Sequence, residues 1–248
     1  MMGQTESGKT YFLRRRFLSS GRLPRVLIID RIGEYRATEK GAILADGLAG
    51  TVRALTECAH RRTWRMVATM DNNDVGVLAR ALIGAPNVEA GFSHNIGGMA
   101  LVLSEIDILV PVGHAPEPLR SLWRRGSHAG LSVLADTQRP SNVNKETTSQ
   151  CRYLGFLALY EPADVEYARR ALGGMADESL AWTHGARYHA ALLDQRERRV
   201  YLIDSEGRVN RTIDPMRDRK EREDGQSDFA RSKLDASRAA PGATWGVK

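Results

Sequence analysis

Residues 3–10 carry a glycine and lysine pattern whose chemistry suits a polyphosphate. They read Gly-Gln-Thr-Glu-Ser-Gly-Lys-Thr and match the phosphate-binding pattern G-x-x-x-x-G-K-[ST] at every defined position. Gly3 and Gly8 can adopt backbone angles that a side chain would forbid, which lets successive N–H groups turn toward the β- and γ-phosphates. Lys9 adds a positive charge, and the Thr10 hydroxyl is a hard oxygen ligand of the kind that Mg²⁺ takes. We therefore predict that a nucleoside triphosphate binds to Gly3, Gln4, Thr5, Glu6, Ser7, Gly8, Lys9, Thr10 and Tyr11.

An apolar run that ends in acidic residues is the second chemical feature. Residues 99–103 predict a buried strand, and the residues that follow match the Walker B pattern, in which a strand end projects carboxylates toward Mg²⁺ and the attacking water. Glu105 is our candidate for polarising that water and for lying beside the metal. Ser104 stands where the pattern usually has its first acid, and its hydroxyl is a candidate for holding a metal-bound water. Asp107 is either a supporting carboxylate or an ordinary surface one.

Two further strand ends carry polar residues. The strand predicted at residues 25–30 ends in Asp-Arg-Ile-Gly-Glu-Tyr, where Asp30 and Glu34 are either ligands at the carboxyl edge of a sheet or parts of a loop cap or ion pair. The strand predicted at 131–136 is followed by Thr-Gln-Arg-Pro. An amide both donates and accepts hydrogen bonds, so Gln138 could sense the γ-phosphate or orient the attacking water.

The elements that must position these residues follow from hydrophobic patterning. Continuous apolar runs predict buried parallel strands, and apolar stripes at helical spacing predict helices between them. Near the end of the domain, the runs 188–193 and 199–203 flank a polar turn and predict a β-hairpin. Further strands are expected at 64–69 and 152–159, with helices at 11–18, 74–83, 119–125 and 162–172.

The start of the chain raises a question about the sheet. A phosphate loop normally follows a buried strand, and only Met1 and Met2 precede Gly3. A central strand donates hydrogen bonds on both sides, so we expect that the first strand of the sheet is truncated here. We also expect the loop to be less ordered until that strand, or a substitute, is supplied.

Composition bounds the class of protein. The chain has 248 residues, of which 42% are hydrophobic and 27% charged, and this suits a single α/β domain. Its net charge of +6 is compatible with a polyanionic partner such as nucleic acid. No apolar run is long enough to span a bilayer, so we expect a soluble protein without a transmembrane segment. Apolar residues become sparse near Asp214, which predicts an ATPase domain at 1–213 and a disordered tail at 214–248.

These motifs stand in an order that resembles the FtsK–HerA superfamily of ring-forming, DNA-translocating P-loop ATPases. The resemblance covers roughly residues 3–175, and the Asp30–Tyr35 and Thr137–Pro140 segments narrow it beyond the phosphate loop alone. Within that superfamily the chain resembles the genome-packaging ATPases of icosahedral viruses with internal membranes. The resemblance implies an additional-strand P-loop core, RecA-like, with a three-layer sandwich, a mostly parallel sheet and a C-terminal hairpin.

The same resemblance implies a mechanism and partners. Lys9 and Thr10 would bind ATP and Mg²⁺, Glu105 would activate water, and Gln138 would act as the sensor. A neighbouring subunit would supply an arginine, for which Arg124 and Arg125 are our candidates, although family members often carry arginine where Ser127 stands. The expected partners are duplex DNA, bound without sequence readout, a homo-oligomeric ring, with a hexamer favoured, and capsid or membrane-vertex proteins. The expected location is the host cytoplasm or the virion.

Two alternatives remain open at this point. The chain could resemble the zonular occludens toxin-like ATPases of filamentous phages, which extrude virions at a membrane, although those proteins usually have a membrane-spanning segment. It could also be a nucleotide-dependent interaction module without turnover, which Ser104 favours and Glu105 argues against.

Overall fold

The structure of the protein is a computed structural model that describes residues 1–3, 7–19, 23–84 and 98–215. Five strands form a parallel sheet in the order β2-β3-β1-β4-β5. Residues 26–29 of β1, residues 66–68 of β3 and all of β4 are buried without interruption, which explains their apolar sequences, because both faces of a parallel sheet are covered by helices. The five strands are β1 (Arg25–Ile29), β2 (Ile43–Asp46), β3 (Trp64–Thr69), β4 (Met99–Leu103) and β5 (Leu131–Ala135).

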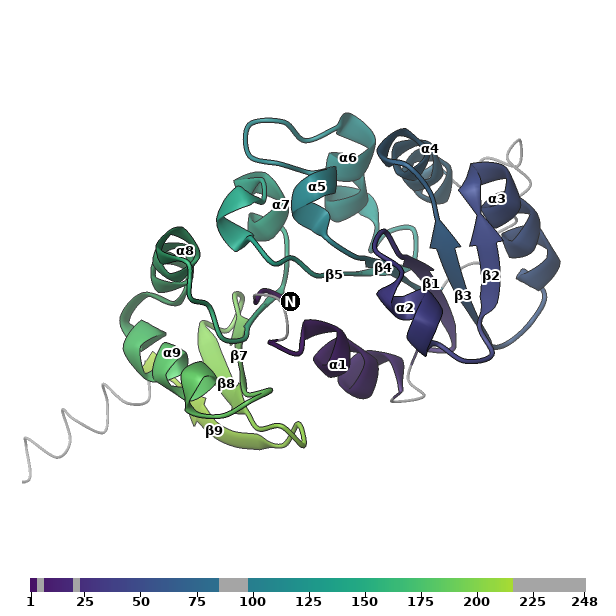
Figure 1. Ribbon diagram of the computed structural model, residues 1–248. Helices are drawn as coiled ribbons and strands as arrows, with labels where there is room; N and C mark the ends of the chain where they lie inside the picture. The colour runs from purple at the N-terminus through teal and green to yellow at the C-terminus, as the bar shows by residue number, and fades with distance from the viewer. Residues whose placement is uncertain (4–6, 20–22, 85–97, 216–248) are drawn as a thin grey trace, which may run out of the picture.

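Helices cover both faces of this sheet, as Figure 1 shows. One face packs against α3 (Gly47–Cys58), α4 (Asn72–Ile83), α5 (Ile106–Leu109) and α6 (Glu117–Arg125). The other face packs against α2 (Glu34–Thr38) and the π-helical segment Arg14–Leu18, which continues from α1 (Lys9–Leu13). This arrangement confirms the predicted α/β class and the three-layer sandwich.

A second sheet follows in the chain and is antiparallel, with the order β6-β7-β8-β9. Its helices are α7 (Lys145–Ser149), which precedes it, and α8 (Pro162–Leu172) and α9 (Ala176–Gly185), which cover one of its faces. Phe12 of α1 packs against Ala190 and Ile203 on the sheet. The strands are β6 (Tyr153–Phe156), β7 (Ala190–Asp194), β8 (Arg199–Ile203) and β9 (Val209–Ile213).

The two sheets meet at the residues that precede the phosphate loop. Met2 forms parallel bridges to Thr137, just beyond β5, and to Phe156 of β6. Its N–H donates to the Gly155 carbonyl at 2.7 Å, and its own carbonyl accepts from Leu157 N–H at 2.8 Å. The chain therefore enters the phosphate loop from between β5 and β6, and β5 separates the loop from β4, as the additional-strand core requires.

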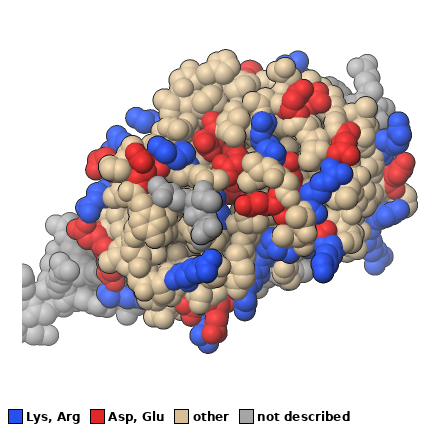
Figure 2. Space-filling view, viewed as in Figure 1, with Lys and Arg blue, Asp and Glu red and all other residues tan. Residues whose placement is uncertain are grey.

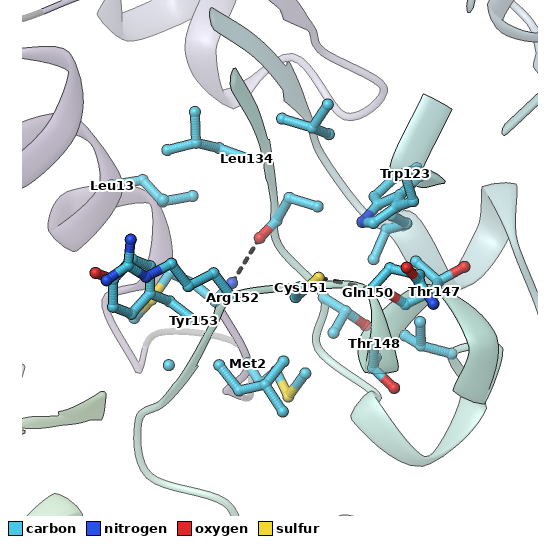
Figure 3. A pocket seen from close by; sticks show the side chains of 18 of the residues that line it. Met2, Leu13, Trp123, Leu134, Thr147, Thr148, Gln150, Cys151, Arg152 and Tyr153 are labelled. Carbon is cyan, nitrogen blue, oxygen red and sulfur yellow. Dashed lines mark hydrogen bonds between the residues drawn. The ribbon is translucent and has the colours of Figure 1, made fainter. Parts of the chain in front are cut away.

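A cavity of about 460 Å³ lies beside this junction. Figure 3 shows Leu134 of β5 and Tyr153 of β6 on its walls, with Met2 at one end. The Met1 amine donates to the Ala135 carbonyl at 2.5 Å, and burial lowers the pKa of this amine. The cavity thus lies between the facing edges of the two sheets, β5 on one side and β6 on the other.

Several predicted boundaries were wrong in detail. Residues 36–60 contain the helix α3 and also the short edge strand β2, which was not predicted. The strand expected at 152–159 is limited to β6, and the terminal hairpin gains a third strand, β9, while α9 was not predicted. Of the predicted tail, Asp214 still pairs with Arg199 at 2.7 Å, and residues 216–248 lie outside the described residues. Within the described parts of the chain, none of the helices combines the length and apolar character needed to cross a bilayer.

Candidate nucleotide site

The phosphate loop lies at the carboxyl edge of the parallel sheet. Gly3 N–H donates to the Thr137 carbonyl at 3.2 Å, which fixes the start of the loop to the tip of β5. Gly8 has φ 93°, a left-handed angle that glycine adopts without strain. Lys9 follows and is only 7% exposed. Gln4, Thr5 and Glu6, assigned to the nucleotide from the sequence, lie outside the described residues.

Glu105 and Gln138 come together at the tips of β4 and β5. The Gln138 amide Nε2 donates to Glu105 Oε1 at 2.9 Å, across 33 residues of sequence. Glu105 is 7% exposed and has φ 53°, a left-handed angle that costs a non-glycine residue about 1–3 kcal/mol. Such strain is typical of functional sites, and here it accompanies a buried carboxylate that is hydrogen-bonded to the Gln138 amide.

The surroundings of Glu105 change its acidity. Burial raises the pKa of the Glu105 carboxyl, and the negative charges of Asp136 and Asp107 raise it further. The hydrogen bond from Gln138 and the positive charge of Lys9 oppose this rise in pKa. The net result is a carboxylate more basic than an ordinary glutamate, which suits a group that accepts or orients a water proton.

Asp136, at the tip of β5, is a member of this cluster that the sequence did not single out. One of its carboxylate oxygens accepts from Glu105 N–H at 3.1 Å, and the other accepts from the Tyr35 hydroxyl at 3.2 Å. Burial raises the pKa of Asp136, which is 3% exposed. Asp136 therefore holds the strained backbone of Glu105 in place. The signal available in the sequence was a carboxylate at the end of an apolar strand next to Gln138.

The segment from Asp30 to Tyr35 has a distinct task at each polar position. The Asp30 carboxylate accepts from Gly33 N–H at 3.0 Å and from Arg36 N–H at 2.7 Å, so it caps the start of α2. This cap places Glu34 beside the phosphate loop, where its carboxylate accepts a hydrogen bond from the Thr10 hydroxyl. Of the alternatives left open by the sequence, Asp30 is the loop cap, and Glu34 lies next to the predicted metal ligand.

Ser104, predicted to hold a metal-bound water, is hydrogen-bonded to the tip of β1. Its hydroxyl donates to the Ile29 carbonyl at 3.1 Å and accepts from Arg31 N–H at 3.0 Å. Its single proton is therefore used, and the side chain is 2% exposed. Ser104 links the tip of β4 to the tip of β1, and this explains a serine at a position where the motif usually has an acid.

Asp107 supports the site from a distance. Its carboxylate accepts from the Thr137 hydroxyl, which in turn accepts from Arg139 N–H at 3.0 Å. Because Thr137 is the residue that pairs with the start of the phosphate loop, Asp107 fixes the junction between β5 and the loop. The structure favours the supporting reading of this carboxylate over the surface one.

The donor set at the loop suits Mg²⁺. Mg²⁺ prefers oxygen ligands and usually keeps several waters, with protein oxygens completing its shell. The Thr10 hydroxyl and the Glu34 carboxylate are neighbouring oxygen donors at the loop, and Glu105 lies at the adjacent strand tip. No group of three or more His, Cys, Asp or Glu side chains in the described residues could hold a metal alone. The ion would therefore depend on phosphate oxygens as well.

Arg124 and Arg125 lie away from this cluster. They end α6, which leads into the amino end of β5, whereas Glu105 and Gln138 lie at the carboxyl ends of their strands. Arg124 pairs with Glu146, and Arg125 is exposed, with no ion pair among the described residues. Neither arginine reaches the site of its own chain, so a role in hydrolysis would require a neighbouring copy.

The charged side chains on the face seen in Figure 2 are unevenly distributed. Figure 2 shows acidic side chains gathered toward the middle of this face, with Lys and Arg dispersed around them. The net charge of +6 is therefore not concentrated in one basic patch on this side of the described residues.

The phosphate loop between β5 and β6, and the buried carboxylate at the tip of β4, define the fold of a P-loop NTPase with an additional strand between the two. Among solved structures, the chain is similar to the genome packaging NTPase B204 from Sulfolobus turreted icosahedral virus 2 in complex with ATP-gammaS. That match has a TM-score of 0.61 at 17% identity and covers 81% of this chain and 93% of B204.

A second structure gives the same result. B204, the DNA-packaging ATPase from Sulfolobus turreted icosahedral virus, matches with a TM-score of 0.59 at 16% identity over 81% of this chain and 93% of its own. The N-terminal domain of zonular occludens toxin from Neisseria meningitidis matches with a TM-score of only 0.38, too low to indicate a shared fold. No protein-family model matches the chain, and no curated protein sequence matches it significantly.

Proposed function

We propose that this chain is an ATPase that drives duplex DNA into a viral capsid. The observation that carries the ATPase assignment is the contact between Glu105 and Gln138 beside the phosphate loop. A buried, strained carboxylate that is hydrogen-bonded to an amide at the next strand tip is the arrangement needed to orient a water for attack on a γ-phosphate. The DNA-packaging part of the proposal is supported by the likeness to B204 and by the order of the sequence motifs.

Each residue has a proposed role in hydrolysis. Lys9 and the loop N–H groups hold the phosphates and neutralise charge that develops on them. Thr10 and Glu34 would hold Mg²⁺, whose positive charge would offset the negative charge of the phosphates. Glu105 accepts a hydrogen bond from the attacking water, and Gln138 aligns the carboxylate while its carbonyl oxygen remains an acceptor.

The decisive experiment measures ATP hydrolysis by the purified chain with and without duplex DNA. We expect duplex DNA to stimulate the ATPase activity. The stimulation should fall with increasing salt and should not depend on DNA sequence, since phosphate contacts dominate such binding. The variant Lys9→Ala should lose both ATP binding and turnover. Equal rates with and without DNA at several salt concentrations would contradict the translocation proposal but leave the ATPase assignment intact. No turnover under any condition would contradict both.

We further propose that the active form is a ring, with a hexamer favoured, in the host cytoplasm or the virion, where it meets capsid or membrane-vertex proteins. In such a ring, Arg124 or Arg125 would reach the site of the next subunit, and this can be worth roughly 10³–10⁵ in rate. Mixing separates this role from a structural one. A Lys9→Ala chain keeps its arginines and an Arg125→Ala chain keeps its phosphate loop, so mixed rings should regain activity that neither has alone.

The matched variant Arg124→Ala identifies which arginine acts. Arg124 forms an ion pair with Glu146 on α7. If this pair only stabilises the fold, Arg124→Ala should lose stability together with activity. Mixed rings that stay as inactive as their components would rule out a trans role for the variant tested. Mass measurement with and without nucleotide gives the ring size independently.

A further inference from the structure

The backbone on both sides of Gln138 is anchored to other parts of the molecule. Before it, Thr137 N–H donates to the Met1 carbonyl at 2.9 Å, and the Thr137 carbonyl accepts from Gly3 N–H at 3.2 Å. After it, the chain forms the 3₁₀ turn Pro140–Asn142, which packs against α8. The position of the Gln138 side chain therefore depends on the phosphate loop on one side and on α8 on the other.

Asp164, in the first turn of α8, provides the second anchor. Its side chain is fully buried, and its Oδ1 accepts from Ser141 N–H at 2.9 Å. The other oxygen, Oδ2, lies 3.3 Å from Arg139 Nε, and Arg139 Nη2 lies 3.9 Å from Glu161 Oε1. Within the described residues Oδ2 accepts no hydrogen bond, so the charge of Arg139 is what offsets the burial of this carboxylate. The residue directly after Gln138 is thus held against α8.

We propose that Arg139 is a positioning residue for hydrolysis, whose ion pair with Asp164 keeps the Gln138 amide in place. Gln138 is the single residue between Thr137 and Arg139, and Arg139 N–H donates to the Thr137 hydroxyl at 3.0 Å. A shift of Arg139 away from α8 would therefore move Gln138, whose Nε2 donates to Glu105 at 2.9 Å. The inference rests on the proposed ATPase function. It makes the geometry of the hydrolysis site depend on α8, a helix that packs on the antiparallel sheet.

A second ion pair of the same kind provides a matched control. Arg152 Nη2 lies 3.4 Å from Asp194 Oδ2, and Asp194 is 2% exposed. As in the first pair, the other carboxylate oxygen accepts backbone N–H groups, here those of Arg196 and Glu197 at 3.0 and 3.1 Å. The two arginine side chains are similarly exposed, 44% for Arg139 and 55% for Arg152. The control pair, however, belongs to the antiparallel sheet, since Arg152 directly precedes β6 and Asp194 ends β7.

The test measures kcat and KM for ATP hydrolysis by the full chain, with thermal unfolding as the readout of stability. A misplacement of about 1 Å can lower an enzyme's rate about 100-fold, so Arg139→Ala should lower kcat about 10- to 100-fold and leave KM unchanged. Arg139→Lys should recover most of this loss, because the lysine ammonium lies one bond beyond the position of Nε and keeps a positive charge beside Asp164. Arg152→Ala should lose a similar amount of stability but keep its kcat. In a Gln138→Ala background, Arg139→Ala should change kcat by less than about twofold, because the side chain through which it acts is already absent.

Three results would overturn the inference: a kcat of Arg139→Ala within about twofold of the wild type, an equal loss of kcat in Arg152→Ala, or a loss that multiplies with that of Gln138→Ala. Each of them leaves the ATPase assignment in place, whereas a wild-type chain without turnover removes the proposed function itself. If Arg139→Ala does not fold, Asp164→Asn is added to it, so that no buried charge is left unpaired. The same kcat criteria then apply to this double variant.

Discussion

Replacing Glu105 with glutamine isolates the carboxylate from everything else in the site. Glutamine has nearly the same shape, and its side-chain oxygen can still accept the 2.9 Å hydrogen bond from Gln138 Nε2. The substitution removes only the negative charge and the basic lone pair. Positioned general acid–base groups contribute about 10²–10⁴ to rate, so turnover should fall by about 100-fold or more while ATP remains bound.

Stability gives an independent check on the same variant, because burial raises the pKa of Glu105. A raised pKa means that the protonated carboxyl stabilises the fold at low pH, and that this contribution is lost as the pH rises through the folded-state pKa. At neutral pH the ionised carboxylate therefore opposes folding. Glu105→Gln should unfold at a higher urea concentration than the wild type at pH 7, and the difference should shrink toward pH 4.

The assays are steady-state ATP hydrolysis, nucleotide retention and urea unfolding across pH. Glu57→Gln is a matched control, since Glu57 lies exposed on α3 and its loss should change neither rate nor stability. The wild-type rate should also fall on acidification, with a midpoint above the ordinary glutamate pKa of about 4.3. Turnover in Glu105→Gln within tenfold of the wild type would refute Glu105 as the water-activating group. Lower stability at pH 7 would refute the account of its burial.

Three further changes probe the elements around this carboxylate. Gln138→Ala should lower turnover strongly while leaving ATP affinity within a few fold, measured by the same assays, and an unchanged rate would remove Gln138 from the mechanism. Tyr35→Phe keeps the buried ring but removes the hydroxyl that donates to Asp136, so urea unfolding should show a loss of about 1.5–3 kcal/mol, the usual value of a hydrogen bond to a charged group; no loss would mean that the bond contributes nothing. Met2 pairs with Thr137, and β5 begins six residues earlier in the chain. About five apolar β-branched residues added before Met1 could therefore pair along β5 as far as its amino end. This extension should raise Tm by about 5 °C or more, because each backbone hydrogen bond adds about 1 kcal/mol and each kcal/mol is worth about 2–4 °C. A Gly-Ser extension of equal length should leave Tm unchanged. Equal Tm values for the two extended proteins would contradict a strand site between β5 and β6.

The parts of the fold that the sequence predicted are those whose pattern is dictated by burial. β1, β3 and β4 are covered on both faces, and their buried stretches, residues 26–29, 66–68 and 99–103, are therefore apolar throughout. The strands missed, β2 and β9, lie at the outer edges of their sheets, where alternate or most side chains face solvent. An edge strand needs few apolar residues, so the segment around Asn210 in β9 resembles a polar loop in composition.

In the candidate site, too, some features follow from local sequence patterns and others do not. The phosphate loop is local in sequence, and Glu105 and Gln138 each follow an apolar run, so all three could be predicted from patterns. The contact of Tyr35 with Asp136 joins residues 101 positions apart, and no local pattern contains it. The left-handed φ of Glu105 and the two bonds of the Ser104 hydroxyl depend likewise on how strand tips meet in space.

The contacts between strand tips explain why the protein has a serine at position 104, where the motif usually has an acid. The Ser104 hydroxyl ties β4 to β1, and the same β1 tip carries Asp30, which caps the helix that places Glu34 beside Thr10. An aspartate at position 104 would bring a further negative charge toward Glu105, whose pKa is already raised by neighbouring carboxylates. Ser104→Asp should therefore raise the pKa of Glu105 further and shift the acid limb of the ATPase profile to higher pH, whereas an unshifted limb would mean that position 104 is electrostatically isolated from Glu105.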